Sequence, residues 1–399
     1  PVWCSKKQEA VLKAHKVLHV IKTLRLGGAE ANLLNLVEAM DPSRFENIVA
    51  YSAGGELEAR FVKAGVRLFK FADGDHKLKS IASLGIVRRL SDFIRRNAID
   101  IVHTHTFNTH VWGGIAAKLV KAKLLEQVHD FRYLENADYN RRRGASRQNW
   151  AVNYLKNFSD RVVVLTDQNA RFIADHRLYP SSKVRVLHNG IPLPALSLSD
   201  LRAASAASRD KFGIARDAQV ILTPIRLAPE KNADLILRIA PEVIARHPRA
   251  VFVIAGDGPL KKDLDHKINS TGLGASVKLI GFEPDVKGLL GMTDILLLPS
   301  FLELHSIALL EAMSTSTPVV ISRNVGCHSD FITNGENGFL LDPFLDQGWA
   351  QTIDALLEDC VLRKNIGANG RKTCERLFDI RDRIKDLEAV YDELLSEPR

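Results

Sequence analysis

Residues 17–40 read VLHVIKTLRLGGAEANLLNLVEAM. The first five, residues 17–21, form a short apolar run that predicts a buried β-strand. A glycine turn with the sequence LGGAE follows at residues 26–30, and residues 31–40 have the apolar spacing of an amphipathic helix. A strand, a glycine turn and a helix in this order are typical of a parallel sheet whose helices cover both faces.

The same alternation continues through the first half of the chain and then stops. Further strands are predicted at residues 47–53, 66–71, 100–106, 123–130, 161–166 and 184–190, and helices at residues 55–65, 80–97 and 113–122. Residues 191–208 are rich in Pro, Ala and Ser, which predicts a linker with a helical start.

After the predicted linker the alternation begins again. The second set of strands is predicted at residues 219–226, 250–258, 276–282, 294–300, 317–323 and 338–342, and helices at residues 233–247, 259–272 and 381–396. We therefore expect an α/β fold with two Rossmann-like domains that face each other across a cleft. The expected domains are residues 1–192 and 193–376, and the helix within residues 377–399 is expected to pack back on the first domain.

Length and composition agree with this organisation. A chain of 399 residues exceeds one ordinary hydrophobic core, and 46% apolar with 26% charged residues is typical of a globular protein. No apolar run reaches the roughly 18 residues of a membrane span, and residues 1–16 lack an apolar signal core. Four scattered cysteines argue for a reducing compartment, so we expect a cytoplasmic protein without a zinc or disulfide framework.

The positive charge is concentrated in the first half of the chain. Residues 1–200 contain 31 Lys and Arg against 19 Asp and Glu, a net charge of +12, whereas the remainder has a net charge of −4. The basic half, which includes Arg141, Arg142 and Arg143, is compatible with an anionic membrane surface or an anionic acceptor. The alternative is solvated charge on exposed helices. No nucleic-acid motif is present, so nucleic acid is not expected as a partner.

Polar residues gather where the predicted strands of the second half end, which is where open α/β sheets bind ligands. Arg226 and Lys231 lie in one loop and predict an anion site. In the segment SFLELHSIALLEAM, residues 300–313, Glu303 follows a strand and Glu311 lies within the next helix. Ser306 is suited to cap that helix, so the N–H groups of Ser306 and Ile307 lie between the two acids. This arrangement suits a ligand with hydroxyl groups at both ends and a diphosphate between them, such as a nucleotide sugar.

Histidines follow two strands of the first half. His103, His105 and His110 lie close together in the sequence, but a metal site needs further ligands at suitable spacing, and none is evident, so no metal site is predicted. His129 ends a predicted strand, where its side chain either contacts a substrate or caps the edge of the core.

These motifs together resemble glycosyltransferase family 4, the retaining nucleotide-sugar transferases with the GT-B type of fold. The resemblance covers essentially the whole chain, and the motifs that carry it are LGGAE (26–30), His129, HNG (188–190), IRLAPEK (225–231), AGDGP (255–259), ELHSIALLE (303–311) and NGENGFLLDP (334–343). It implies that the chain is a retaining hexosyltransferase that needs no metal and no other cofactor.

The resemblance also implies roles for particular residues. The donor diphosphate would be neutralised by Arg226 and Lys231, the sugar hydroxyls would contact Glu303, and the ribose would bind Glu311. His129 would lie near the reacting sugar. The remaining residues implied to bind substrate are Gly27, Gly28, Asn189, Gly281, Phe282, Ser306 and Ile307.

The family usually has Gly-Phe-Gly after the first acid, whereas this chain has Leu304, His305 and Ser306. This departure keeps open a weakly catalytic subunit that binds nucleotide sugars. A nucleotide-sugar epimerase or a phosphorylase on the same architecture also stays open. For the transferase, we expect a nucleoside-diphosphate sugar such as a UDP-sugar as donor. The expected acceptor is a glycan or a lipid-linked hydroxyl in the synthesis of cell-envelope polysaccharide, lipopolysaccharide or glycolipid, with the protein peripheral on the inner face of the plasma membrane.

Overall fold

The computed structural model describes residues 14–25, 27–74, 82–129, 158–193, 200–201, 205–323 and 325–398. The chain divides into two compact units, both of which have an α/β fold, as the alternation of strands and helices predicts. Unit 1 consists of residues 1–165, 169–187 and 384–399, and unit 2 consists of residues 166–168 and 188–383.

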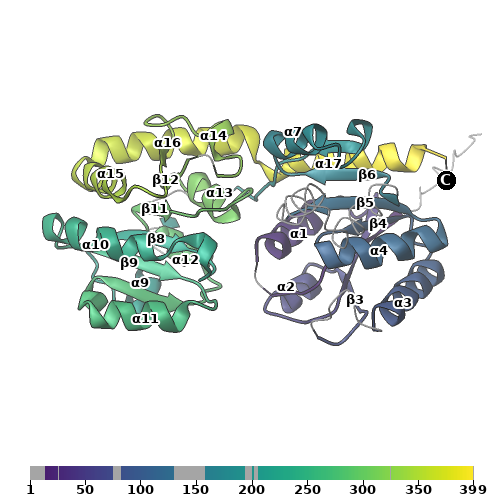
Figure 1. Cartoon of the computed structure of the whole chain (residues 1–399), viewed down its shortest axis with the longest axis horizontal. Coiled ribbons are helices and arrows are strands. Elements are labelled where there is room, and N and C mark those ends of the chain that lie inside the picture. Colours follow the sequence, from purple (N-terminus) through teal and green to yellow (C-terminus); the bar gives the residue numbers. More distant parts are fainter. Residues whose placement is uncertain are drawn as a thin grey trace, which may run out of the picture. The chain divides into compact units, whose positions relative to one another are not determined.

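Unit 1 is built on a seven-stranded parallel sheet with the strand order β3-β2-β1-β4-β5-β6-β7. Figure 1 labels β3, β4, β5 and β6 of this sheet. Its strands are β1 (His15–Val20), β2 (Phe45–Tyr51), β3 (Arg67–Lys70), β4 (Ile101–Thr104), β5 (Lys123–Val128), β6 (Arg161–Val164) and β7 (Val184–Val186). Every residue of β4, β5 and β6 is buried. Strands of a parallel sheet covered on both faces often read as continuous apolar runs, as residues 162–164 of β6 do. The strand β5 also buries the polar residues Lys123, Glu126 and Gln127.

Helices cover the sheet of unit 1. Before the C-terminal helix, those in the described part of unit 1 are α1 (Gly28–Ala39), α2 (Glu58–Lys63), α3 (Ala82–Asn97), α4 (Phe107–Val120), α7 (Asp167–Asp175) and the 3₁₀ turn η1 (Ser181–Lys183). In α3, Ile86, Leu90 and Ile94 recur every four residues and are all buried, so they form the apolar stripe that faces the core. The helix α4 packs beside α3 (Figure 1) and ends at Val120. The next residue, Lys121, has a φ of 59°, the left-handed conformation common after a helix.

The C-terminal helix α17 (Ile380–Ser396) completes unit 1 from residue 384 onward. Tyr391 is fully buried, and its hydroxyl lies 2.7 Å from Nδ1 of His103 in β4. Arg161 of β6 donates to Glu393 at 2.7 Å. These contacts confirm the prediction that the C-terminal helix packs back on the first domain.

Unit 2 is built on a six-stranded parallel sheet with the order β10-β9-β8-β11-β12-β13. Figure 1 labels β8, β9, β11 and β12 of this sheet. Its strands are β8 (Gln219–Pro224), β9 (Ala250–Ala255), β10 (Val277–Gly281), β11 (Ile295–Leu298), β12 (Val319–Ser322) and β13 (Phe339–Leu341). In both units the strand order reverses direction beside the first strand, between β1 and β4 and between β8 and β11. This is the point at which open α/β sheets bind ligands.

The helices of unit 2 cover both faces of its sheet. They are α9 (Ala206–Phe212), η2 (Pro229–Lys231), α10 (Asp234–Arg246), α11 (Lys261–Ser270), η3 (Leu273–Ala275), α12 (Val286–Gly291), α13 (Ile307–Ser314), α14 (His328–Phe331), α15 (Asp346–Glu358) and α16 (Cys360–Leu377). The helices α10 and α15 pack together, as do α13 and α16. This packing fixes α13, which follows the predicted site loop, against the core of unit 2.

The predicted linker at residues 191–208 is wrong at both ends. Ile191 is buried in the core of unit 2, and its N–H donates to the carbonyl oxygen of Phe378 at 2.9 Å. Residues from Ala206 onward belong to α9. The partner of Ile191 lies far along the chain, so local composition could not reveal this pairing. Residues 194–199 and 202–204 lie outside the described residues.

Two further predictions concern the membrane. Among the described residues, no helix is both long enough and apolar enough to span a bilayer. The basic segment with Arg141, Arg142 and Arg143 lies outside the described residues.

Candidate active site

Two loops at the carboxyl ends of β8 and β11 are locked together in unit 2. The carbonyl oxygen of Glu230 accepts a hydrogen bond from the N–H of Phe301 at 2.8 Å. Asn232 has a φ of 52°, a left-handed conformation that Asn tolerates better than most residues, and it is buried. Its Nδ2 donates to the carbonyl oxygens of Pro299 at 3.1 Å and Pro343 at 3.2 Å. The residues that precede and follow Asn232 are therefore held rigidly beside the loop after β11.

Lys231 and Glu303 form an ion pair across these two loops. Lys231 Nζ donates to Glu303 Oε1 at 2.5 Å, and the exposed fractions of the two side chains are 17% and 13%. The hydroxyl of Ser300 donates to the same carboxylate oxygen at 3.2 Å. Removing two charges from water is costly, so each depends on the other for compensation. The structure thus brings together two residues that were predicted to contact different parts of a ligand.

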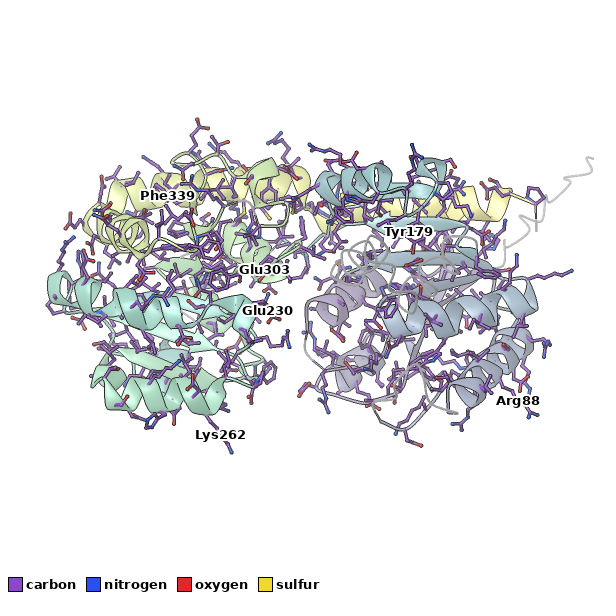
Figure 2. The ribbon with its side chains drawn as sticks, in the orientation of Figure 1. Arg88, Tyr179, Glu230, Lys262, Glu303 and Phe339 are labelled. Carbon is purple, nitrogen blue, oxygen red and sulfur yellow. The ribbon has the colours of Figure 1, made fainter. Side chains whose placement is uncertain are left out.

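Arg226 is the more exposed of the two predicted cations. Its side chain is 57% exposed and pairs with the carboxylate of Glu230, four residues further on. Figure 2 shows Glu230 and Glu303 on the same side of unit 2. The charges of Arg226 and Lys231 are therefore each balanced by a carboxylate, which a bound anion would have to replace or share.

The helix α13 begins where the sequence predicts. Ser306 is its N-cap residue, and its hydroxyl accepts a hydrogen bond from the N–H of Leu309 at 3.4 Å. Within the part of the chain that the structure describes, the N–H groups of Ser306, Ile307 and Ala308 have no hydrogen-bond acceptor. Open N–H groups and the positive end of the helix dipole make this terminus suited to an anion.

Glu311 lies in the second turn of α13 and is partly buried. It is on the same helix whose open N–H groups follow Glu303. The structure therefore has the order along the chain that the sequence predicts: Glu303, then the N-terminus of α13, then Glu311.

His305 does not extend into this site. It is only 6% exposed and packs against His188, with ring centroids 5.7 Å apart, and against Phe378 at 5.0 Å. Burial lowers the pKa of His305 well below its usual value, and His188 and His328 lower it further. The side chain of Asn189 donates to the carbonyl oxygen of His305 at 3.2 Å. His305, one of the three residues that depart from the family pattern, is therefore buried in unit 2.

Gly281 is the last residue of β10, and Phe282 follows the strand. Gly281 has a φ of +73°, and its carbonyl oxygen accepts a hydrogen bond from the N–H of Gly256 at 2.7 Å. A Cβ atom on Gly256 would lie 1.9 Å from the carbonyl oxygen of Ile225, so only glycine allows this close approach. The AGDGP turn thereby supports the loop that carries Arg226. Phe282 is 37% exposed, which leaves its ring accessible.

The glycine pair of unit 1 begins α1. Gly27 is the N-cap residue and Gly28 is the first residue of the helix. A Cβ atom on Gly28 would have no neighbour within 4 Å in the structure. Within the described part of the chain, no atom therefore occupies the space that a side chain at position 28 would need.

His129 follows β5 in unit 1 and is partly buried. Burial and the neighbouring His110 lower the pKa of His129 to about 3. Its Nε2 lies 3.3 Å from Nδ1 of His105. The sequence therefore indicated the position of His129 at a strand end but not its histidine partner.

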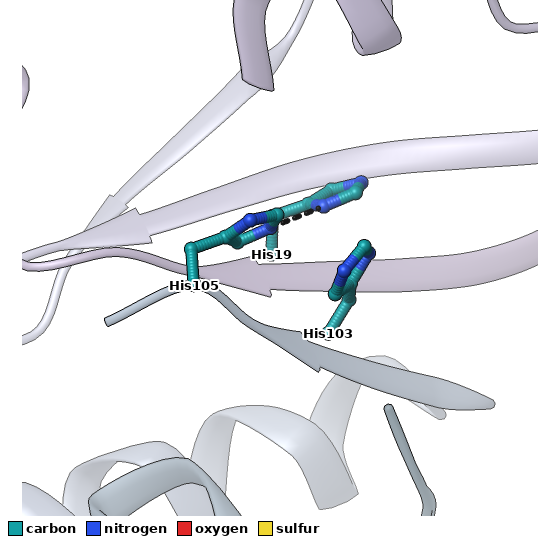
Figure 3. Close-up of side chains that lie close together, drawn as sticks. All are labelled: His19, His103 and His105. Carbon is teal, nitrogen blue, oxygen red and sulfur yellow. Dashed lines mark hydrogen bonds between the residues drawn. The ribbon is translucent and has the colours of Figure 1, made fainter. Parts of the chain in front are cut away.

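Three histidines lie together at the centre of the unit 1 sheet (Figure 3). One nitrogen from each of His19, His103 and His105 lies within 4.8 Å of the others, and all three side chains are buried. His110, which the sequence grouped with His103 and His105, instead lies 2.8 Å from the hydroxyl of Thr104. His19 was not among the residues predicted from the sequence. The only available indication was its position in the first strand, which pairs with the strand of His103.

Comparison with known proteins agrees with this geometry. The Glycosyltransferase Family 4 model matches residues 26–193, and the model of Glycosyl transferases group 1 matches residues 205–373. UDP-Gal:alpha-D-GlcNAc-diphosphoundecaprenol alpha-1,3-galactosyltransferase of Escherichia coli is 26% identical over 390 residues, covering 93% of this chain and 96% of that protein. Alpha-D-kanosaminyltransferase of Streptomyces kanamyceticus is 25% identical over 284 residues, covering 70% and 73%.

A solved structure shows the same fold. Anabaena HepE, crystallised in complex with UDP and glucose, matches with a TM-score of 0.80 and 21% identity, covering 95% of this chain and 99% of that chain. The two parallel sheets and these matches define a glycosyltransferase of the GT-B type. The chain belongs to glycosyltransferase family 4.

Proposed function

We propose that the chain transfers a hexose from a UDP-sugar to a hydroxyl group of a glycan or a lipid-linked acceptor, with retention of the anomeric configuration. The observation that carries the proposal is the Lys231–Glu303 ion pair beside the open N–H groups that begin α13. Positive groups for a diphosphate and a carboxylate for sugar hydroxyls are thereby held on one rigid edge of unit 2. The names of the relatives support a UDP-sugar donor and a hexosyl product.

In this proposal Arg226, Lys231 and the N–H groups of α13 stabilise the negative charge that develops on the departing diphosphate. Glu303 accepts hydrogen bonds from sugar hydroxyls, and Glu311 accepts them from the ribose. The bond between the anomeric carbon and the diphosphate oxygen breaks while the acceptor oxygen bonds to the same face of that carbon. The acceptor proton passes to the departing phosphate oxygen. No metal ion is required, because the cationic groups neutralise the diphosphate.

The acceptor is assigned to unit 1, where Gly28 and His129 follow strands β1 and β5. A lipid-linked acceptor is supported by the diphosphoundecaprenol acceptor in the name of the Escherichia coli relative and by the basic first half of the chain. Such an acceptor places the protein at an anionic membrane surface during envelope polysaccharide or glycolipid synthesis. Binding to vesicles that contain anionic lipid at low salt, and its loss at high salt, tests this part.

A donor screen tests the transfer itself. Purified chain is incubated with a panel of nucleotide sugars, with and without lipid-linked and glycan acceptors, and free UDP and the product anomer are measured. We expect acceptor-dependent UDP release and a product with the donor's anomeric configuration. A new free sugar without acceptor identifies an epimerase, a requirement for phosphate identifies a phosphorylase, and tight binding without turnover identifies a binding subunit.

The Arg226→Ala, Lys231→Ala double variant links the reaction to the proposed residues. We expect its turnover to fall at least about a hundredfold, the loss typical of one oxyanion donor. The matched control, Arg249→Ala with Lys262→Ala, removes two exposed cations of the same unit. Equal turnover in the two double variants would overturn the assignment of the diphosphate site.

A further inference from the structure

Four side chains of unit 1 form one continuous line of hydrogen bonds across neighbouring strands. Oδ1 of Asn47 in β2 lies 2.9 Å from Nε2 of His19 in β1. Nδ1 of His19 lies 3.1 Å from Nε2 of His105, which follows β4. Nδ1 of His105 lies 3.3 Å from Nε2 of His129, which follows β5. Figure 3 shows the middle link, between His19 and His105.

The amide of Asn47 determines which atoms along this line donate and which accept. Its Nδ2 donates to the carbonyl oxygen of Phe45 at 3.5 Å, so Oδ1 faces His19. The opposite orientation of the amide would place two oxygen acceptors against each other. Because Oδ1 can only accept, Nε2 of His19 carries a proton.

The donor and acceptor roles of the other ring nitrogens follow from the proton on Nε2 of His19. A neutral imidazole has one N–H group and one lone pair, so Nδ1 of His19 is an acceptor and Nε2 of His105 donates to it. By the same reasoning, Nδ1 of His105 accepts from Nε2 of His129. The three imidazoles are therefore all Nε2–H tautomers, and the lone pair on Nδ1 of His129 ends the line.

The three imidazoles of this line are neutral near pH 7, because their surroundings disfavour the protonated form. Burial lowers the pKa of His19 to about 4 and that of His129 to about 3. The pKa of His105 is lowered well below its usual value, first by burial and then by the surrounding histidines. Each imidazole of the line consequently has one proton near neutral pH. Among the described residues, Nδ1 of His129 has no hydrogen-bond partner.

We propose that Asn47, His19 and His105 are positioning residues that hold His129 as the Nε2–H tautomer, so that its Nδ1 accepts a hydrogen bond from a substrate hydroxyl. The link to substrate rests on the proposed function, whereas the tautomers do not. The ligand group that His129 selects must be a hydrogen-bond donor. A hydroxyl satisfies this requirement, and a methoxy group or fluorine in its place does not.

The tautomers can be observed directly. In the full chain labelled with ¹⁵N-histidine, long-range ¹H–¹⁵N correlation spectra distinguish the Nε2–H tautomer, the Nδ1–H tautomer and the imidazolium ion. We expect Nε2–H tautomers at His19, His105 and His129 at neutral pH. An Nδ1–H tautomer or an imidazolium at any of the three would overturn the proposal. So would one equivalent of bound metal by elemental analysis of the purified chain, because a metal would occupy lone pairs that the line uses.

A variant at the far end of the line tests its consequence. Asn47→Leu keeps a similar size and removes the acceptor, so we expect mixed tautomers at His129. We expect kcat to fall roughly ten- to a hundredfold, as when a partner that orients a functional histidine is lost, with KM for the donor little changed. The control Tyr391→Phe removes the hydroxyl beside His103 in the same cluster and should leave the tautomers at His19, His105 and His129 unchanged.

The outcomes separate the two proposals. A folded Asn47→Leu variant with the wild-type tautomer at His129 would overturn the positioning role, and if that variant does not fold, the wild-type spectra decide. Expected tautomers in a chain that transfers no sugar would overturn the proposed function and leave the hydrogen-bond line in place.

Discussion

The Nζ atom of Lys231 lies 2.5 Å from Oε1 of Glu303, and both side chains are largely buried although the residues are 72 positions apart in the sequence. Each side chain therefore has a structural partner before any ligand arrives. A donor diphosphate would compete with Glu303 for Lys231, and the sugar hydroxyls would compete with Lys231 for Glu303. Exchange of this ion pair for ligand contacts is the event on which the proposed chemistry depends.

Breaking the ion pair should reduce both stability and activity. Lys231→Met leaves Glu303 as a buried charge without its cation, so we expect the free energy of unfolding to fall by about 3–5 kcal/mol. Adding Glu303→Gln to that variant should recover much of the stability but none of the turnover. Urea titration and UDP release measure the two effects. Strictly additive stability losses in the double variant would contradict the coupling of the pair.

We expect Gly28 to be needed for substrate binding and not for the stability of the fold. Because a Cβ atom at this position meets no protein atom within 4 Å, Gly28→Ala should leave the melting temperature unchanged or slightly raised. We expect at least about a tenfold loss of kcat/KM, equivalent to about 1.4 kcal/mol, if substrate approaches this backbone. Steady-state kinetics and thermal unfolding test both parts. The comparison variant Gly65→Ala, at a φ of +75°, should lose stability instead.

Unit 1 should lose stability in mild acid. Burial lowers the pKa of His110 to about 3 and that of His19 to about 4, and burial together with His110 lowers the pKa of His129 to about 3. Between pH 6.5 and pH 4 the unfolded chain therefore binds more protons than the folded chain. The free energy of unfolding should therefore be constant above about pH 7 and fall as the pH drops, by up to about 1.4 kcal/mol per pH unit for each histidine.

Urea titrations from pH 8 to pH 5 measure this dependence. His110→Gln should flatten the decline, whereas His15→Gln, at a half-exposed histidine, should not. A decline of the same steepness in both variants would show that the buried histidine is not its source.

The packing of α17 on unit 1 should depend on its buried face. Leu394 is fully buried, and Leu394→Ala should reduce the free energy of unfolding by about 2–5 kcal/mol. The neighbouring Leu395 is only partly buried, so Leu395→Ala should cost clearly less. Chemical denaturation of the two variants provides the comparison, and equal losses would argue against the described packing.

Much of the fold was predictable because buried parallel strands are continuous apolar runs. The segments around Val162 and Leu296 could be recognised for that reason, and Ser306 was recognisable as a helix cap from its own chemistry. The order of Lys231, Glu303 and Glu311 along the chain also indicated a ligand site at strand ends. These predictions rely on local features of the sequence.

The parts that escaped prediction depend on partners distant in sequence. Nothing near His103 reveals that Tyr391 will bind it or that His19 will lie beside it. The inward packing of His305 likewise depends on Phe378. Because such pairings arise from strand order and helix docking, single-sequence patterns do not contain them.

The helix α17 contributes residues to both units, and this has a consequence for synthesis on the ribosome. The last strand of the unit 1 sheet ends at Val186, but the residue that covers His103 is Tyr391. At 5–20 residues per second, roughly 200 residues take about 10–40 s to translate. During that interval the nascent chain exposes the surface that Tyr391 and Leu394 later cover, while residues 188–383 emerge in full. The domain that is translated first is therefore the one whose core is closed last.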